Sequence, residues 1–585
     1  MVVITGYGIV SAIGVGKAET LDALRHHRSG IAPVRYLDTV HRDMLVGEVK
    51  LSFDELMARV GVPSDAEAPQ SRTALIGRLA LREALQQAGL TSPDDYATMA
   101  LLSGPTVGGM DRTEIEASVS ADGTIEHYNY DCGTSTLDIA RGFGQFAFVD
   151  TISTACSSAA NALILGAEML KAGEADIVVA GGTEALSVFH LNGFNSLMIL
   201  DKAHCRPFDE MRQGLNLGEG AAYVVLESEE HARKRQVSTH AFLRGYGNAC
   251  DAFHQTASSE NGEGAYLAMQ EALGMAGLNP KDVDYVNAHG TGTPNNDFSE
   301  SVALQRVFGS QMPPVSSTKG FTGHTTSASG SIEAVICLLA MHHGFLPANL
   351  GWKQPMSDGI IPTLGEDKVS LRHVLCNSFG FGGNDSSLLL SMDPDCRAVP
   401  ASPMSTSSIS ELARVEICSE EELAEIRDFV KPLEARRMGK LMKASLLSSL
   451  KALRQAGIDC PDAIITGTSL GCWENTETLL TQIEQEGEVM LSPTNFMQST
   501  HNTIGSNIAI RTHCHGYNVT YTQCDESLEW ALRDARRQLM SGRCKTVLVG
   551  CHDETTHLYR SLMERLGVTG LPSIHSVAIV LRSEK

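Results

Sequence analysis

The chain has 585 residues, which is enough for about three to five domains of ordinary size and excludes a single small fold. Hydrophobic residues make up 43% and charged residues 20%, and 54 glycines stand against 20 prolines, a composition typical of a globular protein with many tight turns. The formal net charge of −23 repels phosphate backbones and anionic lipid, so a nucleic-acid or membrane-surface role is disfavoured.

The cysteines and the N-terminus indicate the compartment. The 14 cysteines include no C-x-x-C pair, so neither a disulfide framework nor a zinc ribbon is indicated. The first residues, MVVITGYGIVSAIG, lack the basic region and apolar run of a signal peptide, and no stretch reaches about 18 apolar residues. The sequence therefore predicts a soluble, cytoplasmic protein.

Predicted strands and helices alternate along most of the chain. Short β-branched runs at 2–5, 176–182 and 221–227 are bounded by glycine, and Ala/Leu-rich stretches such as 71–90 have helical character. This alternation predicts an α/β layered fold whose strands are buried on both faces. A Pro/Ser/Thr-rich segment at 395–410 interrupts the pattern and is interpreted as a linker.

The segment after the linker repeats features of the N-terminal part. Three stretches are similar in pairs: 435–458 to 71–90, 463–480 to 99–116, and 539–554 to 170–185. These pairs predict a repeated half-domain. The alternative is coincidence, because any series of helix, glycine and strand resembles another.

Cys156 lies where a predicted strand turns sharply into a helix, within VDTISTACSSAANALILGAEML at 149–170. The unpaired N–H groups and the dipole at a helix N-terminus stabilise a thiolate, so we expect a lowered pKa and a nucleophile. The alternative for a lone cysteine is a buried structural thiol.

Two histidine motifs favour the nucleophile. NAHGTGTPNND at 287–297 exposes His289 at the end of a predicted strand. STKGFTGHTTSASGSIEAV at 317–335 places Lys319 five residues before His324, and Glu333 nine residues after it. Three such sites on Gly-rich turns indicate covalent catalysis by cysteine with histidine support.

Taken together, these motifs resemble those of the β-ketoacyl-acyl carrier protein synthases of the thiolase superfamily. The matching pieces are TACSSA, NAHGTGT, KGFTGH, NSFGFGGND at 377–385, VVITGYGIVSAIG, GGTEALSVFHLNGF at 181–194 and RPFDEMRQGLNLGEGAA at 206–222. The resemblance covers residues 1 to about 393. It implies a five-layer αβαβα thiolase-like fold made of two related halves.

The resemblance also implies a reaction and its residues. An acyl group would move from a carrier thioester to Cys156, and malonyl carrier protein would then lose CO2 in a decarboxylative Claisen condensation. His289 and His324 would bind the malonyl thioester carbonyl, Lys319 would hold the local charge, and Glu333 would orient the lysine. The oxyanion hole would be formed by the N–H groups of Cys156 and Phe381, and the Phe381 ring would gate the site.

Further residues are implied to contact substrate: Thr291, Thr293, Met110, Phe194 and Phe379. The threonines would bind the phosphopantetheine arm, and Met110 would limit chain length. Phosphopantetheine arrives on the acyl carrier protein, so no bound cofactor and no metal are expected. GYGIVSAIG at 6–14 is not a G-x-G-x-x-G motif and is interpreted as a structural turn.

The C-terminal piece resembles the N-terminal halves of ketosynthase-like proteins from polyene pigment clusters. It ends before any counterpart of HGTGT, KGFTGH or GFGG, so it cannot supply the decarboxylating histidines. Gly542 lies 18 residues after Cys524, whereas Gly173 lies 17 after Cys156. Cys524 is therefore interpreted as a structural thiol, and the half-domain as a non-catalytic partner that tunes chain length or stabilises an assembly.

The predicted organisation has four parts: 1–235 (nucleophile half), 236–393 (histidine half), 394–412 (linker) and 413–585 (ketosynthase-like half-domain). The expected state is a homodimer, or a heteromer with another ketosynthase-like subunit. The pathway is fatty-acid or aryl-polyene and polyketide-type biosynthesis, with the fused tail favouring the latter. Two alternatives remain: a non-condensing, chain-length-factor-like subunit and a thiolase-fold acyltransferase.

Overall fold

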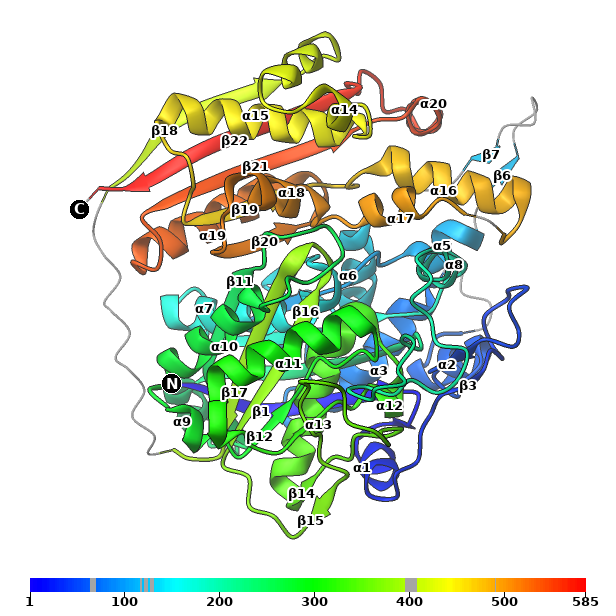
Figure 1. The fold of residues 1–585 in the computed structure, drawn as a ribbon, viewed down its shortest axis with the longest axis vertical. Helices are drawn as coiled ribbons and strands as arrows, with labels where there is room; N and C mark the ends of the chain where they lie inside the picture. The colour runs from blue at the N-terminus through cyan, green and yellow to red at the C-terminus, as the bar shows by residue number, and fades with distance from the viewer. Residues whose placement is uncertain are drawn as a thin grey trace.

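A computed structural model describes residues 1–63, 70–115, 118–119, 125–126, 131–394, 408–489 and 491–584 (Figure 1). Within these ranges, each helix is too short or too polar to cross a membrane. The chain forms a large N-terminal body, called here the catalytic domain (residues 1–394), and a smaller C-terminal body, called the tail (residues 408–584). In Figure 1 the tail, coloured yellow to red, lies above the catalytic domain.

The catalytic domain contains one mixed sheet built from two halves. The first half has the strand order β1 (Val2–Ser11), β10 (Gly220–Ser228), β9 (Ile177–Glu184), β5 (Ala100–Ser103) and β8 (Phe148–Thr151). The second has the order β11 (Ala241–Cys250), β17 (Asn384–Ser391), β16 (His373–Gly380), β12 (Tyr285–Asn287) and β13 (Val315–Ser316). The halves are joined by two residue pairs between β1 and β11.

The helices form three layers around these two half-sheets. The central layer contains α7 (Ser158–Ala172) and α13 (Ser329–His343), whose apolar residues form one buried core with both half-sheets. The outer layers contain α3 (Arg72–Gln87) with α6 (Cys132–Arg141), and α10 (Glu263–Ala276) with α11 (Pro294–Phe308). A helix that is apolar on all sides must lie between layers, as α7 does. The predicted five-layer αβαβα fold is confirmed.

Shorter helices complete this domain. They are α1 (Lys17–Arg25), α2 (Phe53–Val60), α4 (Pro93–Tyr96), α5 (Met110–Ile115), α8 (Val188–Ser196), α9 (Glu229–Arg235) and α12 (Lys319–Thr322).

The tail repeats the first half of the catalytic domain. Its sheet has the order β18 (Ile409–Ile417), β22 (Ile574–Ser583), β21 (Thr546–Glu554), β19 (Ala463–Gly467) and β20 (Tyr517–Tyr521). Helix α15 (Lys440–Ala456) covers one face and α19 (Ser527–Met540) the other. The remaining helices are α14 (Pro432–Ala435), α16 (Trp473–Glu486), α17 (Pro493–Ser499), α18 (Thr503–Thr512) and α20 (His557–Arg565).

A β-bulge shows how closely the two copies match. The β1–β10 register shifts between Ile4 and Gly6, and the β18–β22 register shifts between Glu411 and Ala413, the matching place. Most of the predicted linker lies outside the described residues. Its last four residues belong to β18, because Ile409 already pairs with Ser583; the tail therefore begins before residue 413.

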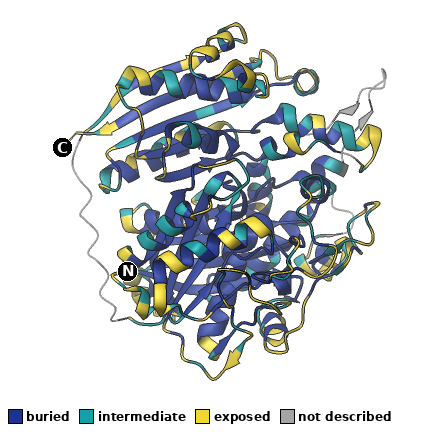
Figure 2. Ribbon diagram, in the orientation of Figure 1, coloured by how far each residue is buried: buried dark blue, intermediate teal, exposed yellow. Residues whose placement is uncertain are grey.

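The edge strands of the two bodies meet and extend the sheet. Ile152 and Tyr521 form an antiparallel bridge. The Ser153 N–H donates to the Thr520 carbonyl and the Thr522 N–H to the Thr151 carbonyl, each at 2.9 Å. This reciprocal pairing has the symmetry of an interface between two identical subunits. Figure 2 shows that the strands on both sides of this seam are buried.

Candidate active site

Cys156 sits on a strained turn between β8 and α7. It belongs to a single 3-10 turn, Ala155–Ser157, and Ala155 has a φ of 51°. A positive φ at a residue with a Cβ is uncommon and costs energy that the surrounding packing must supply. The Ser378 hydroxyl donates to the Cys156 carbonyl at 3.0 Å. The turn therefore holds the thiol at the helix start that the sequence predicted.

Both predicted histidines converge on this thiol. His324 Nε2 lies 3.2 Å from the Cys156 sulfur, and the two imidazole rings are 5.3 Å apart and nearly perpendicular. His289 directly follows Ala288 at the end of β12, and its backbone N–H donates to Glu300 on α11 at 2.9 Å. Glu300, which was not predicted from the sequence, therefore holds the backbone of the loop that carries His289 in place.

Lys319 and Glu333 lie next to His289, as predicted. The Lys319 Nζ donates to Glu333 Oε1 and to the His289 carbonyl, both at 2.6 Å, and lies 3.3 Å from His289 Nδ1. An ammonium group has donors but no acceptor, so a hydrogen bond to Nδ1 leaves the His289 proton on Nε2. This contact selects the tautomer that can donate into the cavity.

Burial keeps both imidazoles neutral. It lowers the pKa of His289 and of His324 well below the usual value, and the positive charge of Lys319 adds to the effect. A neutral imidazole can donate one hydrogen bond to a developing oxyanion without carrying a proton that must first be lost.

The pKa of the Cys156 thiol differs from the sequence-based expectation. Burial raises it to about 11, and this outweighs Lys319 and the two backbone N–H groups, of Phe381 and Cys156 itself, which lower it. The helix-terminus effect is present, but desolvation is larger because the thiol is only 5% exposed. Cys156 therefore carries its proton at neutral pH, with the neutral His324 imidazole positioned to accept it.

The two backbone N–H groups predicted to form an oxyanion hole lie beside the thiol, and so does the Phe381 ring. The N–H groups of Cys156 and Phe381 both point to the Cys156 sulfur. Gly382 and Gly383, with φ of 84° and 74°, follow Phe381 and permit the tight turn. The Phe381 ring stacks on Phe194 at 5.7 Å.

A cavity of about 430 Å³ leads from the surface to Cys156. The predicted substrate residues Thr291, Thr293, Phe194 and Phe379 line it together with both catalytic histidines. The Thr291 and Thr293 hydroxyls are 2.9 Å apart. The cavity therefore offers an apolar wall and a pair of hydroxyls along the approach to the thiol.

A second, narrow pocket of about 10 Å³ shares Cys156, Phe194 and Phe381 with this cavity and is lined by both bodies. The tail contributes Phe496, Ser499 and Thr500. A Cβ on Gly193 would lie 2.1 Å from the Phe496 ring, so the missing side chain there makes room for the phenyl group. The tail residues were missed because the pairing of distant segments leaves no local sequence signal.

Met110, the predicted chain-length residue, does not line either of the two cavities beside Cys156. It is buried in the apolar cluster that contains Val107 and Phe194. Among the described residues, the walls of the two cavities beside Cys156 are formed by other side chains.

The corresponding turn of the tail carries an aspartate where the catalytic domain has its cysteine. Cys524 has a φ of 47° and so matches Ala155 rather than Cys156. The Gln523 N–H bonds the Ser527 hydroxyl just as the Thr154 N–H bonds Ser158, both at 2.9 Å. Asp525 is therefore the counterpart of Cys156. This one-residue shift explains the difference in spacing to Gly542 and Gly173.

Cys524 itself points to the catalytic domain. Its thiol donates to Asp131 at 3.1 Å, and burial with the adjacent carboxylate raises its pKa. A thiol held in this way is a poor nucleophile.

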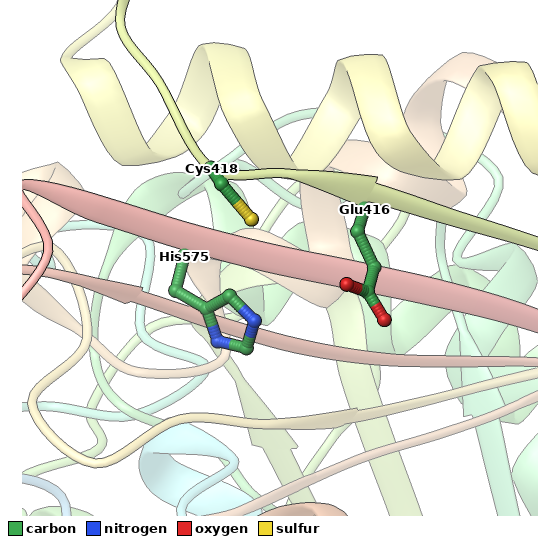
Figure 3. A group of neighbouring side chains, drawn as sticks. All are labelled: Glu416, Cys418 and His575. Atoms are coloured by element: carbon green, nitrogen blue, oxygen red, sulfur yellow. The ribbon is translucent and has the colours of Figure 1, made fainter.

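Within the described residues, one group of three side chains is close enough to share a metal ion. The donor atoms of Glu416 on β18, Cys418 directly after β18, and His575 on β22 lie within 4.8 Å of one another (Figure 3). All three are exposed, and they belong to the edge of the tail rather than to the cavities beside Cys156.

Comparison with protein families accounts for both bodies. Residues 1–232 match the model "Beta-ketoacyl synthase, N-terminal domain", and 240–353 match "Beta-ketoacyl synthase, C-terminal domain". Residues 411–585 match a second model with the N-terminal description. The 3-oxoacyl-[acyl-carrier-protein] synthase 2 of Vibrio cholerae is 31% identical over 412 residues, which cover 66% of this chain and 98% of that protein.

Solved structures show the same division. The ishigamide ketosynthase/chain length factor is 31% identical, with a TM-score of 0.61, over 67% of this chain and 99% of that one. The PfaC keto synthase-chain length factor is 16% identical with a TM-score of 0.77, and covers 100% of this chain and 78% of that one, so the fold is shared along the whole length. This chain is a member of the β-ketoacyl synthase family.

Proposed function

We propose that this chain is a β-ketoacyl-acyl carrier protein synthase that carries out decarboxylative Claisen condensation. The observation that supports this most is the convergence of the buried side chains of Cys156, His289 and His324 on one cavity, with two backbone N–H groups at the sulfur. A cysteine acyltransferase without condensation does not need a second neutral imidazole donor next to its nucleophile.

The acyl transfer step uses Cys156 and His324. The thiol attacks the thioester carbonyl of the acyl carrier, His324 Nε2 takes the thiol proton, and the carrier leaves as a thiolate that receives this proton from His324. The oxyanion formed in between accepts from the N–H groups of Cys156 and Phe381. The acyl group then enters the narrow pocket next to Phe381, whose lining side chains must move apart to admit it.

The condensation step uses both histidines. Malonyl carrier protein enters the 430 Å³ cavity. Its thioester oxygen accepts from the Nε2–H groups of His289 and His324, with His324 in the tautomer whose Nδ1 accepts from the Ser329 hydroxyl, 3.1 Å away, and the carbon–carbon bond to the carboxylate breaks to release CO2. The enolate attacks the acyl thioester on Cys156 and forms the new carbon–carbon bond, and the Cys156 thiolate that leaves takes a proton from solvent to regenerate the thiol. Lys319 and Glu333 act as positioning residues for His289.

The proposed partner is an acyl carrier protein, as in the name of the Vibrio cholerae relative. The pathway proposed is aryl-polyene or polyketide-type biosynthesis. This part rests on the fused tail and on the likeness to a ketosynthase/chain length factor.

The test is intact-mass analysis of the wild type and Cys156→Ala after incubation with acyl carrier proteins of varied chain length. Acylation of the wild type alone, followed by a β-ketoacyl product after malonyl carrier protein is added, supports the proposal. Acylation without a condensation product favours the simple acyltransferase, and a folded protein that takes up no acyl group favours the non-condensing subunit.

We also propose that the tail acts as a built-in partner subunit that closes the acyl pocket. It occupies the edge of β8, where it makes the reciprocal strand pairing, and it contributes Phe496 to the pocket wall. The chain therefore resembles a ketosynthase heterodimer in one polypeptide.

Replacement of Phe496 tests this role. Phe496→Ala enlarges the pocket, and we expect it to shift the preferred acyl donor to a longer chain by one further condensation unit. Phe429→Ala is the matched control, because Phe429 packs under Arg454 inside the tail. An unchanged chain-length profile in a folded Phe496→Ala protein argues against a role for the tail in chain length.

A further inference from the structure

The gate loop, residues 380–384, is held by a helix of the tail. Asn502 directly precedes α18, and its side-chain amide donates to the Phe381 carbonyl at 2.8 Å and to Asn384 Oδ1 at 2.6 Å. A Cβ on Gly382 would lie 2.1 Å from the Ser506 hydroxyl, one turn further along α18. The backbone of the gate is therefore packed directly on this helix.

A neighbouring loop, residues 251–256, is tied to the same helix and to the gate. The Gln255 side chain donates to Asn507 Oδ1 on α18 at 2.9 Å. The Gln255 carbonyl accepts from the Gly382 N–H at 2.7 Å, and the Asp251 N–H donates to the Gly383 carbonyl at 2.8 Å. The two loops and α18 thus form one hydrogen-bonded unit.

The position of this unit decides what reaches Cys156. The Phe381 ring lines both the open cavity and the narrow pocket, so an acyl chain must displace it to pass from one to the other. The Phe381 N–H is also one of the two donors at the Cys156 sulfur. A contact that fixes the Phe381 backbone therefore affects both the passage of acyl chains to Cys156 and the position of the Phe381 N–H at the sulfur.

From these contacts we propose that Asn502 is a positioning residue that clamps the gate loop closed, so that the tail controls the access of acyl chains to Cys156. The gate can open only after the two hydrogen bonds from Asn502 are broken. The proposal deepens the proposed function, on which it rests for the identity of the acyl substrate.

Two substitutions separate the clamp from general packing. Asn502→Asp keeps the shape of the side chain but presents a carboxylate, which cannot donate, to two oxygen acceptors. Asn502→Ala removes the donor without adding charge. The loss of these two hydrogen bonds should raise the open population about fivefold to tenfold.

The experiment measures alkylation of Cys156 in the full chain by two reagents with the same reactive group. Iodoacetamide is small, whereas N-octyl iodoacetamide must place its chain beyond the gate. The rates are followed by mass spectrometry of the peptide that contains Cys156. Neither reagent requires acyl transfer, so the result is independent of whether the condensation reaction proposed above is correct.

We expect the ratio of the octyl rate to the small-reagent rate to rise about fivefold to tenfold in both Asn502 variants. It should stay at the wild-type value in Asn475→Asp, where the amide donates to Asn495 within the tail. An unchanged ratio in folded Asn502 variants overturns the proposal. So does a rise confined to Asn502→Asp, because repulsion by the new charge then explains it. If Asn502→Asp fails to show a cooperative melting transition, Asn502→Ala alone decides.

Discussion

Residues 1–235 and the tail have the same sheet and the same turn at the start of a central helix, but they differ in what covers that turn. In the catalytic domain α13 and the second half-sheet lie over it, and the Ser327 hydroxyl donates to Glu184 at 2.7 Å from that side. In the tail the matching carboxylate, Asp553, accepts from Thr468 and Ser469 of its own half.

The nucleophile turn alone is therefore not an active site. A thiol at the turn becomes a catalyst when a second half-domain brings two neutral histidines and the Phe381 N–H to it. Residues 408–584 hold only the first type of half-domain, and the exposed Asp525 occupies the nucleophile position. The tail does pair its edge strand β20 with β8, and it contributes Phe496 to the narrow pocket beside Cys156.

The largest expected effect comes from replacing, one at a time, the cysteine at the turn of each copy. Cys156→Ala should reduce acyl transfer by about a thousandfold or more, because the covalent intermediate cannot form. Cys524→Ala should leave the rate within about twofold of the wild type. Intact mass after incubation with acyl carrier protein measures both, and acylation that persists in Cys156→Ala but is lost in Cys524→Ala would reverse the assignment of the two copies.

Replacement of His289, which has no counterpart in residues 408–584, should slow condensation more than acylation. His289→Ala should lower condensation by about a hundredfold to a thousandfold, because one donor to the malonyl oxyanion is lost. Acylation of Cys156 should continue, since His289 is not the residue at the sulfur. Separate measurement of acylation and of CO2 release distinguishes the steps, and an equal loss in both would place His289 in the first step as well.

The seam between the two copies can be weakened without touching the active site. Arg537 is 2% exposed in its side chain and pairs with Glu174 of the catalytic domain at 2.7 Å and with Asp534 of its own helix at 3.1 Å. Arg537→Met leaves the buried Asp534 without its cation and Glu174 with only the more distant Arg533, 3.9 Å away, and should lower the free energy of unfolding by about 3 kcal/mol.

Chemical denaturation followed by tryptophan fluorescence measures the effect of Arg537→Met. Arg414→Met is the control, because Arg414 pairs with Glu411 on the exposed edge of β18 and its loss should change stability by less than about 1 kcal/mol. Equal losses in the two variants would mean that the seam pairing contributes no more than a surface pair.

The smallest effect is a pH dependence that reports the burial of Cys156. Because alkylation requires the thiolate and the pKa is raised to about 11, the logarithm of the iodoacetamide rate should rise with unit slope from about pH 7 to about pH 10. An exposed cysteine reaches a plateau above about pH 8.5. A plateau near that value for Cys156 would show that the N–H groups and Lys319 outweigh desolvation.

The sequence was most informative where function depends on local turns. Cys156, His289, Lys319, His324 and Phe381 all lie in short Gly-rich motifs, and the structure brings them together. The repeat was also detectable, because helix, glycine and strand recur in the same order. The sequence also showed that Cys524 lies one residue further from its following glycine than Cys156 does. The backbone φ angles were needed to explain this difference, because they show that Cys524 matches Ala155.

By itself the sequence determined the α/β layered fold and the repeated tail, because both depend on periodicity along the chain. Its short motifs resemble those of a known family, and this resemblance implied the two halves and the residues that the structure brings together around Cys156. Tertiary structure alone decided three other properties: the raised pKa of Cys156, the contribution of Phe496 to the acyl pocket, and the hold of Asn502 on the gate. The first depends on how much water the folded chain excludes. The other two depend on how two bodies, more than a hundred residues apart in sequence, pack against each other.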